Sequence, residues 1–531
     1  MVNKMKRLLV LLFIILKETG PTAAHTCTCS SWVCNCAYRG ITSVPQDLPT
    51  TITQLNLGHN PITTLSQSDF SSYRSLWRIE SISSQISVIN NGTFHNLTSL
   101  RELYLSNNQL TNLAADTFKE NDDLRLLWLD GNQLTSLPSN IFEGLGNLQR
   151  LRLGENQFTS FPADIFKGLA NLVRLSLLKN QLSSLPSGIF QGLVSLEYLY
   201  LDENNLSSLP AELFVWLGNL EYLKLTENQL SSLPANTFVG LANLETLYLD
   251  ENQLSSLSAY TFVGLANLEE LYLDENQLIS LAADTFVGLP YLVYLYLSEN
   301  QLSSLPTDIF AGLRNLEELT LYDNQLSVLP DDVFKGLGNL DSLNIRRNKL
   351  VSLPAGVFEG LGNLRYLRFP QNQLSSLDAD IFPVLASASY VDISDNPWEC
   401  DCNMLPFKQM MTGSNAFENE MTCAGPTRPA NLTGLSLLND VNPEDLICEE
   451  TTTVPSTPMT STPLAPASTP KPAATCSTLS SFWKNCVNKM FWKRATCRGK
   501  SCSKCRKKFR KVCPDTNTRW GTCLREFRKC A

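Results

Sequence analysis

Leucine recurs along most of the chain with a fixed period of 24 residues. Each unit follows the pattern LxxLxLxxNxLxxLPxxxFxxLxx, and its LxL stretch alternates inward leucines with outward side chains, as a β-strand does. An asparagine follows almost every such strand, from Asn60 to Asn396, and only Ser84 interrupts the series. Phenylalanine forms a second column, which recurs with the same period from Phe70 to Phe382. The pattern predicts fourteen contiguous coils and a fifteenth that merges into the segment after them.

One coil cannot cover its own leucines, so neighbouring coils have to stack in a quasi-linear array. We therefore predict an α/β solenoid of horseshoe form with a parallel β-sheet on its concave side. At about 4.8 Å per strand, the strands of the repeats would extend on the order of 65 Å. The asparagine amides are expected to hydrogen-bond the unpaired turn backbone, which is a structural role and not a ligand-binding one.

Cysteine-rich segments flank the repeats, which occupy residues 52–395. A stack of coils exposes apolar surface at both ends, so we predict that residues 25–51 and 396–448 are disulfide-bonded caps. Their cysteines are Cys27, Cys29, Cys34 and Cys36 in the first segment, and Cys400, Cys402, Cys423 and Cys448 in the second. The residues alone leave three pairings open for the second group.

Residues 1–24 have the composition of a secretory signal. Lys4, Lys6 and Arg7 precede a run of apolar residues, and small residues follow near the predicted mature start at His25. A membrane anchor is disfavoured because the apolar run is much shorter than the roughly 20 residues that span a bilayer. The basic C-terminus is also unlike the hydrophobic tail of a lipid-anchor signal. We expect a secreted, extracellular protein without a transmembrane segment.

Residues 449–475 hold eight threonines, six prolines and three serines, a composition that predicts an extended, O-glycosylated stalk. Residues 476–531 hold eight cysteines and 16 Lys+Arg against 2 Asp+Glu, a charge of +14, whereas the rest of the chain carries 26 basic and 49 acidic residues. This small module suits an anionic polymer or a microbial surface, while nucleic acid is less favoured. A merely solubilising charge, docking on the acidic solenoid, and a zinc site at Cys502 and Cys505 are the alternatives. The predicted anion-binding residues are Lys504, Arg506, Lys507, Lys508, Arg510 and Lys511.

The outward strand positions form columns on the predicted concave face, and their centre is rich in tyrosine and edged with carboxylates. Arginines flank it toward each end. The predicted ligand-binding residues are Tyr198, Tyr200, Asp202, Tyr222, Tyr248, Asp250, Glu270, Tyr272, Asp274, Tyr294, Tyr296 and Tyr322. Tyrosine offers a large apolar face and a polar tip at little entropic cost, so it favours binding over the alternative of a simple aromatic ladder. The carboxylates could attract a cation or calcium, but a solvated acidic surface is the favoured interpretation.

Four sequons predict N-glycosylation in a secreted chain. They begin at Asn91, Asn96, Asn205 and Asn431. Asn205 lies just past a predicted strand, so a glycan there would sit at the edge of the sheet.

Catalysis is disfavoured because the usual acid-base residues are missing from the sheet. The chain has 3 histidines, and none falls on the central strands. Neither a phosphate loop nor a nucleophile elbow is present, and an open sheet cannot exclude water from a reaction. We expect no catalytic residue, no cofactor and no metal.

The repeat, the paired caps and the segment from Asn396 to Cys402 resemble extracellular leucine-rich-repeat (LRR) proteins, a group that includes Slit, Toll-like receptor ectodomains, small proteoglycans and variable lymphocyte receptors. With the Thr/Pro stalk, the chain looks most like the last of these, although its basic cysteine-rich end departs from their hydrophobic anchor signal. The resemblance implies that Cys400 pairs with Cys423 and Cys402 with Cys448. It also implies a secreted recognition protein of innate-immune type that binds a protein or glycan. The alternative is a matrix or guidance protein tethered to heparan sulfate.

Overall fold

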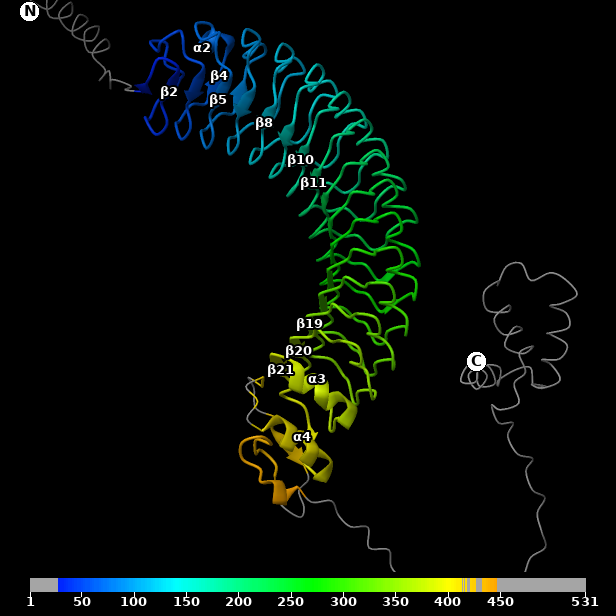
Figure 1. The fold of residues 1–531 in the computed structure, drawn as a ribbon. Helices are drawn as coiled ribbons and strands as arrows, with labels where there is room; N and C mark the ends of the chain where they lie inside the picture. Colours follow the sequence, from blue (N-terminus) through cyan, green and yellow to red (C-terminus); the bar gives the residue numbers. More distant parts are fainter. Residues whose placement is uncertain (1–26, 413, 415, 418–420, 426–431, 447–531) are drawn as a thin grey trace, which may run out of the picture. The chain divides into compact units, whose positions relative to one another are not determined.

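The computed structural model describes residues 27–412, 414, 416–417, 421–425 and 432–446. In this part the chain forms a curved stack of coils, and one strand of each coil lies along the inner side of the curve (Figure 1). The predicted signal segment, stalk and basic module lie outside the described residues. Within the described residues, no helix is long and apolar enough to cross a membrane.

The inner side is a 17-stranded sheet, as the predicted solenoid requires. Its first strand is antiparallel to the second, and each later strand is parallel to the one before it. Its strands are β1 (Thr28–Cys29), β2 (Val33–Asn35), β3 (Gln54–Asn56), β5 (Arg78–Glu80), β7 (Glu102–Tyr104), β8 (Leu126–Trp128), β9 (Arg150–Arg152), β10 (Arg174–Ser176), β11 (Tyr198–Tyr200), β12 (Tyr222–Lys224), β13 (Thr246–Tyr248), β15 (Glu270–Tyr272), β17 (Tyr294–Tyr296), β18 (Glu318–Thr320), β19 (Ser342–Asn344), β20 (Tyr366–Arg368) and β21 (Tyr390–Asp392). The strands from β3 onward correspond to the predicted repeats and the partial one after them.

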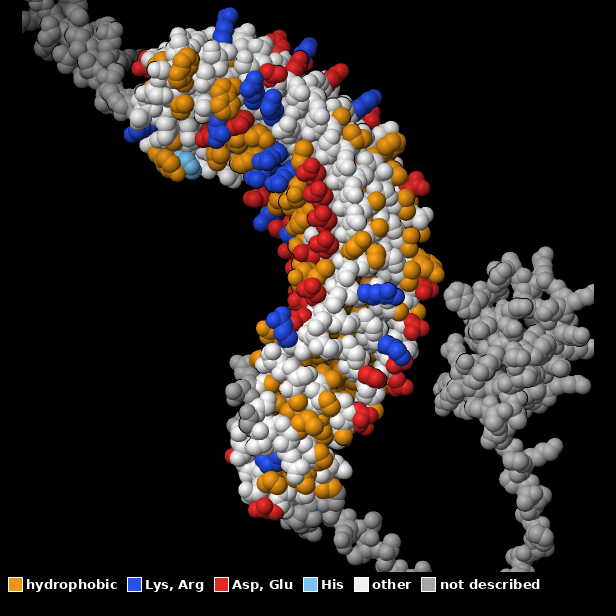
Figure 2. Space-filling view, in the orientation of Figure 1, with side chains coloured by type: hydrophobic (Ala, Val, Ile, Leu, Met, Phe, Trp, Pro, Cys, Tyr) orange, Lys and Arg blue, Asp and Glu red, His pale blue; other side chains and the backbone are white. Residues whose placement is uncertain are grey.

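The register of the sheet follows the period of the sequence. Leu199 pairs with Leu223, and Leu223 pairs with Leu247. Because each partner lies one repeat further along the chain, equivalent residues form straight columns across the sheet. Figure 2 shows one consequence, a line of acidic side chains along the concave side with basic side chains gathered toward its N-terminal end.

The remaining elements are short. They comprise three two-stranded sheets, two on the coils and one in the C-terminal cap, and a few helices of one or two turns. The pairs are β4 (Thr64–Leu65) with β6 (Val88–Ile89), β14 (Ser256–Leu257) with β16 (Ser280–Leu281), and β22 (Trp398–Glu399) with β23 (Cys423–Gly425). The helices are α2 (Gln67–Phe70), η1 (Ala379–Ile381), α3 (Phe382–Ser387), η2 (Cys402–Met404), α4 (Leu405–Met411) and η3 (Pro443–Asp445).

The core consists of the inward leucines of the strands and a stack of phenylalanines on the return side of the coils. Leu199 and Leu201 are fully buried. Phe214 and Phe238 are also buried, and their rings lie parallel with centroids 6.4 Å apart. Each ring therefore fills the space between its own coil and the next, so the core is continuous along the stack.

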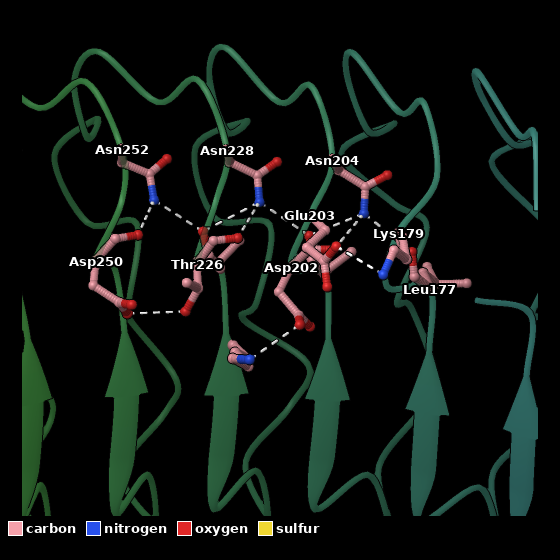
Figure 3. A network of polar contacts seen from close by, with 12 residues as sticks. Leu177, Lys179, Asp202, Glu203, Asn204, Thr226, Asn228, Asp250 and Asn252 are labelled. Atoms are coloured by element: carbon pink, nitrogen blue, oxygen red, sulfur yellow. Dashed lines mark hydrogen bonds and ion pairs between the residues drawn. The ribbon is translucent and has the colours of Figure 1, made fainter. Parts of the chain in front are cut away.

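The asparagine column joins each coil to the one before it (Figure 3). The Asn228 Nδ2 atom donates to the carbonyl oxygens of Leu225 and Thr226 in its own coil, at 3.1 and 3.2 Å, and to that of Leu201 in the preceding coil at 3.0 Å. The backbone N–H of Leu206 donates to Asn228 Oδ1 at 3.0 Å. These bonds satisfy turn backbone that has no ladder partner, which confirms the predicted structural role.

Disulfides close both caps. Cys27 pairs with Cys36 and Cys29 with Cys34, a nested arrangement that the sequence left open. Cys400 pairs with Cys423, which confirms the pairing implied by the resemblance. Cys402 is also disulfide-bonded, and its predicted partner at position 448 lies outside the described residues. The caps thus cover the apolar ends of the stack with cross-linked chain.

Candidate ligand-binding surface

The predicted binding residues all lie on one stretch of the concave sheet, from β11 to the turn after β18. We call its eight half-buried tyrosines the tyrosine surface. They are Tyr198, Tyr200, Tyr222, Tyr248, Tyr272, Tyr294, Tyr296 and Tyr322. Glu270 lies on β15, while the three aspartates follow the ends of β11, β13 and β15. The straight columns of the sheet bring these residues together although they span several repeats.

The tyrosines stack on one another across the strands. The rings of Tyr248 and Tyr272 have centroids 4.2 Å apart and an interplanar angle of 7°. Tyr272 and Tyr296 repeat this arrangement at 4.6 Å and 10°, and Tyr222 meets Tyr248 at 5.3 Å. The stack fixes the side-chain rotamers before any ligand arrives, so a partner would lose little entropy in ordering them.

The hydroxyls of Tyr222, Tyr272 and Tyr296 remain protonated at physiological pH. Burial is the main cause that raises the pKa of Tyr222, Tyr272 and Tyr296 above the ordinary value, and neighbouring acidic groups add to it. The Tyr272 hydroxyl donates to Glu270 Oε2 at 3.0 Å. The surface therefore presents neutral hydroxyls that can donate or accept a hydrogen bond.

The three aspartates are less exposed than a solvated acidic surface requires. Asp202 retains only 5% exposure, and its Oδ2 lies 3.1 Å from Lys224 Nζ. Asp250 Oδ1 accepts from Thr226 Oγ1 at 2.9 Å (Figure 3). These aspartates, which come just after the strand ends, contact side chains of the adjacent coils. The alternation of strand positions does not predict such contacts. The solvated interpretation is thus wrong for Asp202, while Asp250 and Asp274 are partly exposed.

Asp274 is the most perturbed of these carboxyl groups. Burial is the main cause, and the charge of Asp250 adds to it, so that the pKa of Asp274 rises to about 7 despite a 2.7 Å bond from the Ser298 backbone N–H. Burial also raises the pKa of Asp250. In the described part of the chain, no three His, Cys, Asp or Glu residues converge in a way that could hold a metal ion.

Glutamates border the strands at positions that the sequence analysis did not single out. Glu197, Glu221 and Glu245 line a recess together with Asn219 and neighbouring amides. Beyond the opposite ends of the strands, a second glutamate column stands just before the asparagine in several of the coils. Its residues adopt the left-handed backbone conformation, with φ of 52° at Glu227. The 24-residue alignment contains both columns, so position alone would have revealed them.

The other predicted sites are only partly described. Asn91, Asn96 and Asn205 are exposed, and the Asn205 amide oxygen accepts from Gln229 Nε2 at 3.1 Å. Asn431 and the predicted anion-binding residues between positions 504 and 511 lie outside the described residues.

Comparison with known families identifies the repeat. A family model described as leucine rich repeat matches overlapping segments that run from residue 82 to residue 397, which is more than half of the chain. The chain belongs to the leucine-rich-repeat family. The LRR solenoid is typically a scaffold that binds proteins without catalysing a reaction.

Solved structures with the same architecture include a bacterial LRR protein and a chain of an insect protein complex. An LRR protein of Leptospira interrogans is 30% identical, with a TM-score of 0.59 over 71% of this chain and 92% of that one. The glycosylated Toll–Spatzle complex of Drosophila contains a chain that is 25% identical, with a TM-score of 0.63 over 75% of this chain and 58% of that one. Both likenesses extend over most of this LRR protein.

Curated relatives match over short stretches. Toll-like receptor 3 of Bos taurus is 38% identical over 66 residues, which are 12% of this chain and 7% of the receptor. Toll-like receptor 3 of Boselaphus tragocamelus is 42% identical over 55 residues, 6% of its length. This LRR protein thus matches only a small part of each curated relative.

Proposed function

We propose that this LRR protein is a secreted recognition protein of innate-immune type that binds a protein or glycan on its tyrosine surface. The observation that carries the proposal is the ordered stack of Tyr248, Tyr272 and Tyr296 on an open concave sheet. A solvated sheet face does not need such a stack, and exposed aromatic patches usually mark contact surfaces. The Drosophila structure is a complex of Toll with Spatzle, which supports a protein as one ligand class.

The basic module would supply a second contact. Residues 476–531 carry a net charge of +14, which suits an anionic polymer or a microbial envelope. Two weak sites joined by the Thr/Pro stalk gain avidity on a surface that presents both ligands. N-linked glycans at the exposed sequons, with the one at Asn205 on the sheet edge, would limit the approach of a ligand from that side.

The test measures binding of the full secreted chain to microbial envelope components and to host glycosaminoglycans at physiological salt. Tyr248→Ala combined with Tyr272→Ala removes the centre of the stack and is expected to abolish binding to the solenoid's ligand. Tyr260→Ala with Tyr291→Ala is the matched control, because both tyrosines are 55% exposed and lie outside the concave sheet.

A different outcome would favour a matrix or guidance protein. In that case the chain would bind only heparan sulfate, and replacing Lys507, Lys508, Arg510 and Lys511 by glutamine would abolish this binding. The tyrosine variants would then bind as the wild type does, which contradicts recognition through the tyrosine surface.

A further inference from the structure

A cavity opens on the concave sheet beside the N-terminal end of the tyrosine surface. It lies over β9 and β10 and has a volume of about 290 Å³, near the lower end of the range of small-ligand sites. We call it the arginine pocket. Its polar lining consists of Asp130, Arg150, Arg152, Glu155, Arg174, Ser176 and Tyr200.

The arginines of this pocket are positioned by aromatic rings. Arg152 Cζ lies 4.0 Å above the Trp128 ring, and Arg174 Cζ lies 4.2 Å above the Tyr198 ring. Stacking holds a guanidinium group in place while its N–H donors point outward in the plane of the guanidinium group itself. Two cations of the lining are therefore oriented without the help of a carboxylate.

These arginines differ from others on the same solenoid. Arg78, Arg347 and Arg365 each form an ion pair with a nearby carboxylate. Among the ion pairs of the described residues, none involves an arginine of the pocket. The donors of Arg152 and Arg174 are thus available to an external anion.

A glycine keeps the floor of the pocket open. Gly154 stands in the outward column that holds Asp130 one coil earlier and Leu178 one coil later. A Cβ atom at this position would lie 3.0 Å from both the side chain and the carbonyl oxygen of Leu178. Any side chain here would crowd that neighbour and occupy the cavity.

The lining selects the chemistry of a ligand. Three arginines against Asp130 and Glu155 leave an excess of one positive charge, which matches one carboxylate better than a phosphate dianion or a polyanion. The two carboxylates and Ser176 can accept hydrogen bonds from hydroxyl groups, and Tyr200 offers a flat apolar face. An acidic sugar combines these three features, namely one carboxylate, several hydroxyls and an apolar ring face.

We propose that the arginine pocket binds a carboxylated sugar residue of a glycan. The inference rests on the proposed recognition function, and it names the ligand chemistry at one end of the tyrosine surface. Arg152 and Arg174 hold the carboxylate with charge-assisted hydrogen bonds, and Asp130 accepts from a sugar hydroxyl.

The experiment compares the binding of sialyllactose and neutral lactose to the full secreted chain by isothermal titration calorimetry at physiological salt. Sialyllactose is expected to bind and lactose to bind at least about tenfold more weakly, because lactose lacks the carboxylate. Arg152→Gln and Arg174→Gln should each weaken sialyllactose binding about tenfold. The basic module is identical in all variants, so the difference between variants reports on the pocket alone.

Arg125→Gln is the matched control, because it removes the same charge from an exposed arginine in the preceding coil that does not line the pocket. Equal affinity for sialyllactose and lactose, or loss of binding in the control as well, overturns the inference. Inorganic sulfate or a glutamate-rich hexapeptide that binds the pocket more tightly than sialyllactose also overturns it. If the arginine variants keep the ligand found for the solenoid while the Tyr248 and Tyr272 double variant loses it, the proposed function stands without this inference.

Discussion

Two sets of columns alternate on the same coils and obey different constraints. The buried columns repeat one residue type almost without exception, as the run of asparagines from Asn60 to Asn396 illustrates. The concave columns change from coil to coil, so that Arg174, Tyr198 and Tyr222 stand side by side in one register. The buried contacts therefore determine the path of the backbone and the stability of the fold. The concave side chains remain free to determine what is bound.

The largest expected effect is the loss of a phenylalanine ring from the core. Phe238 is 1% exposed and stacks between Phe214 and Phe262. Phe238→Ala should lower the free energy of unfolding by about 3–5 kcal/mol, because it removes buried apolar surface and leaves a cavity. Denaturant unfolding followed by circular dichroism measures this.

Tyr248→Ala is the concave counterpart in the neighbouring part of the same coils. Its ring is half-buried and rests on other tyrosines, so the expected loss is about 1 kcal/mol. If Phe238→Ala and Tyr248→Ala destabilise the protein equally, then the buried columns and the concave columns do not differ in their contribution to stability.

A loss smaller than that of Phe238→Ala, but larger than that of Tyr248→Ala, is expected from the asparagine column. Asn228→Ala leaves the Leu206 N–H without its partner, and it removes one of the two amide bonds to each of the Leu201 and Leu225 carbonyls. The expected decrease in the free energy of unfolding is about 2–3 kcal/mol, because buried polar groups lose hydrogen bonds. The measurement is again denaturant unfolding.

The break in the column allows the reverse experiment. Ser84 reaches only the Leu57 carbonyl, at 3.5 Å. Ser84→Asn restores the repeat pattern and should raise the free energy of unfolding by about 1 kcal/mol. A destabilising Ser84→Asn together with a harmless Asn228→Ala would contradict the structural role of the column.

A pH-dependent effect is expected at Asp274, a residue of the concave face whose burial influences stability. The pKa of Asp274 rises to about 7 in the folded chain from 3.8, so folding favours the protonated carboxyl. Its contribution to stability is complete below pH 4 and is lost as the pH rises toward 7. In the wild type we expect the free energy of unfolding to fall by about 2 kcal/mol over this range because of Asp274, after allowing for its partial exposure. The side chain of the Asp274→Asn variant stays neutral, so this variant should show a smaller decrease.

Unfolding free energies measured between pH 4.5 and pH 7.5 test this prediction. Glu275→Gln, which removes an exposed carboxylate next to Asp274, is the control and should leave the pH profile unchanged. Parallel profiles for the wild type and Asp274→Asn would show that this carboxyl group does not titrate as described.

The fold was predictable from the sequence because its period is rigid. Leu199, Leu201 and Asn204 occupy repeat positions whose spacing specifies the strand, the inward face and the turn, and all three are buried as expected. The position of the tyrosine surface followed from the same register. The pairing of Cys400 with Cys423 depended on the resemblance, since the residues alone allowed three arrangements.

Contacts between side chains of adjacent coils were not predictable from the period. Asp202 was expected to be solvated, but it turns toward Lys224 in the next coil. Arg152 was recognised as a flanking arginine, yet its stacking on Trp128 depends on rotamers and on the open space at Gly154. Alternation along a strand gives the face of a residue and not the neighbour that it meets.

The identical bonds made by successive asparagines have a consequence at the level of the gene. Because each coil meets its neighbours through the same carbonyls and the same phenylalanine stack, a duplication or deletion of 24 codons within the repeats joins two surfaces that already fit. Such an event keeps the reading frame and both caps, and it lengthens or shortens the concave sheet by one strand, about 4.8 Å. Unequal recombination can therefore change the span of the concave sheet in discrete steps, without the need for compensating substitutions in the core.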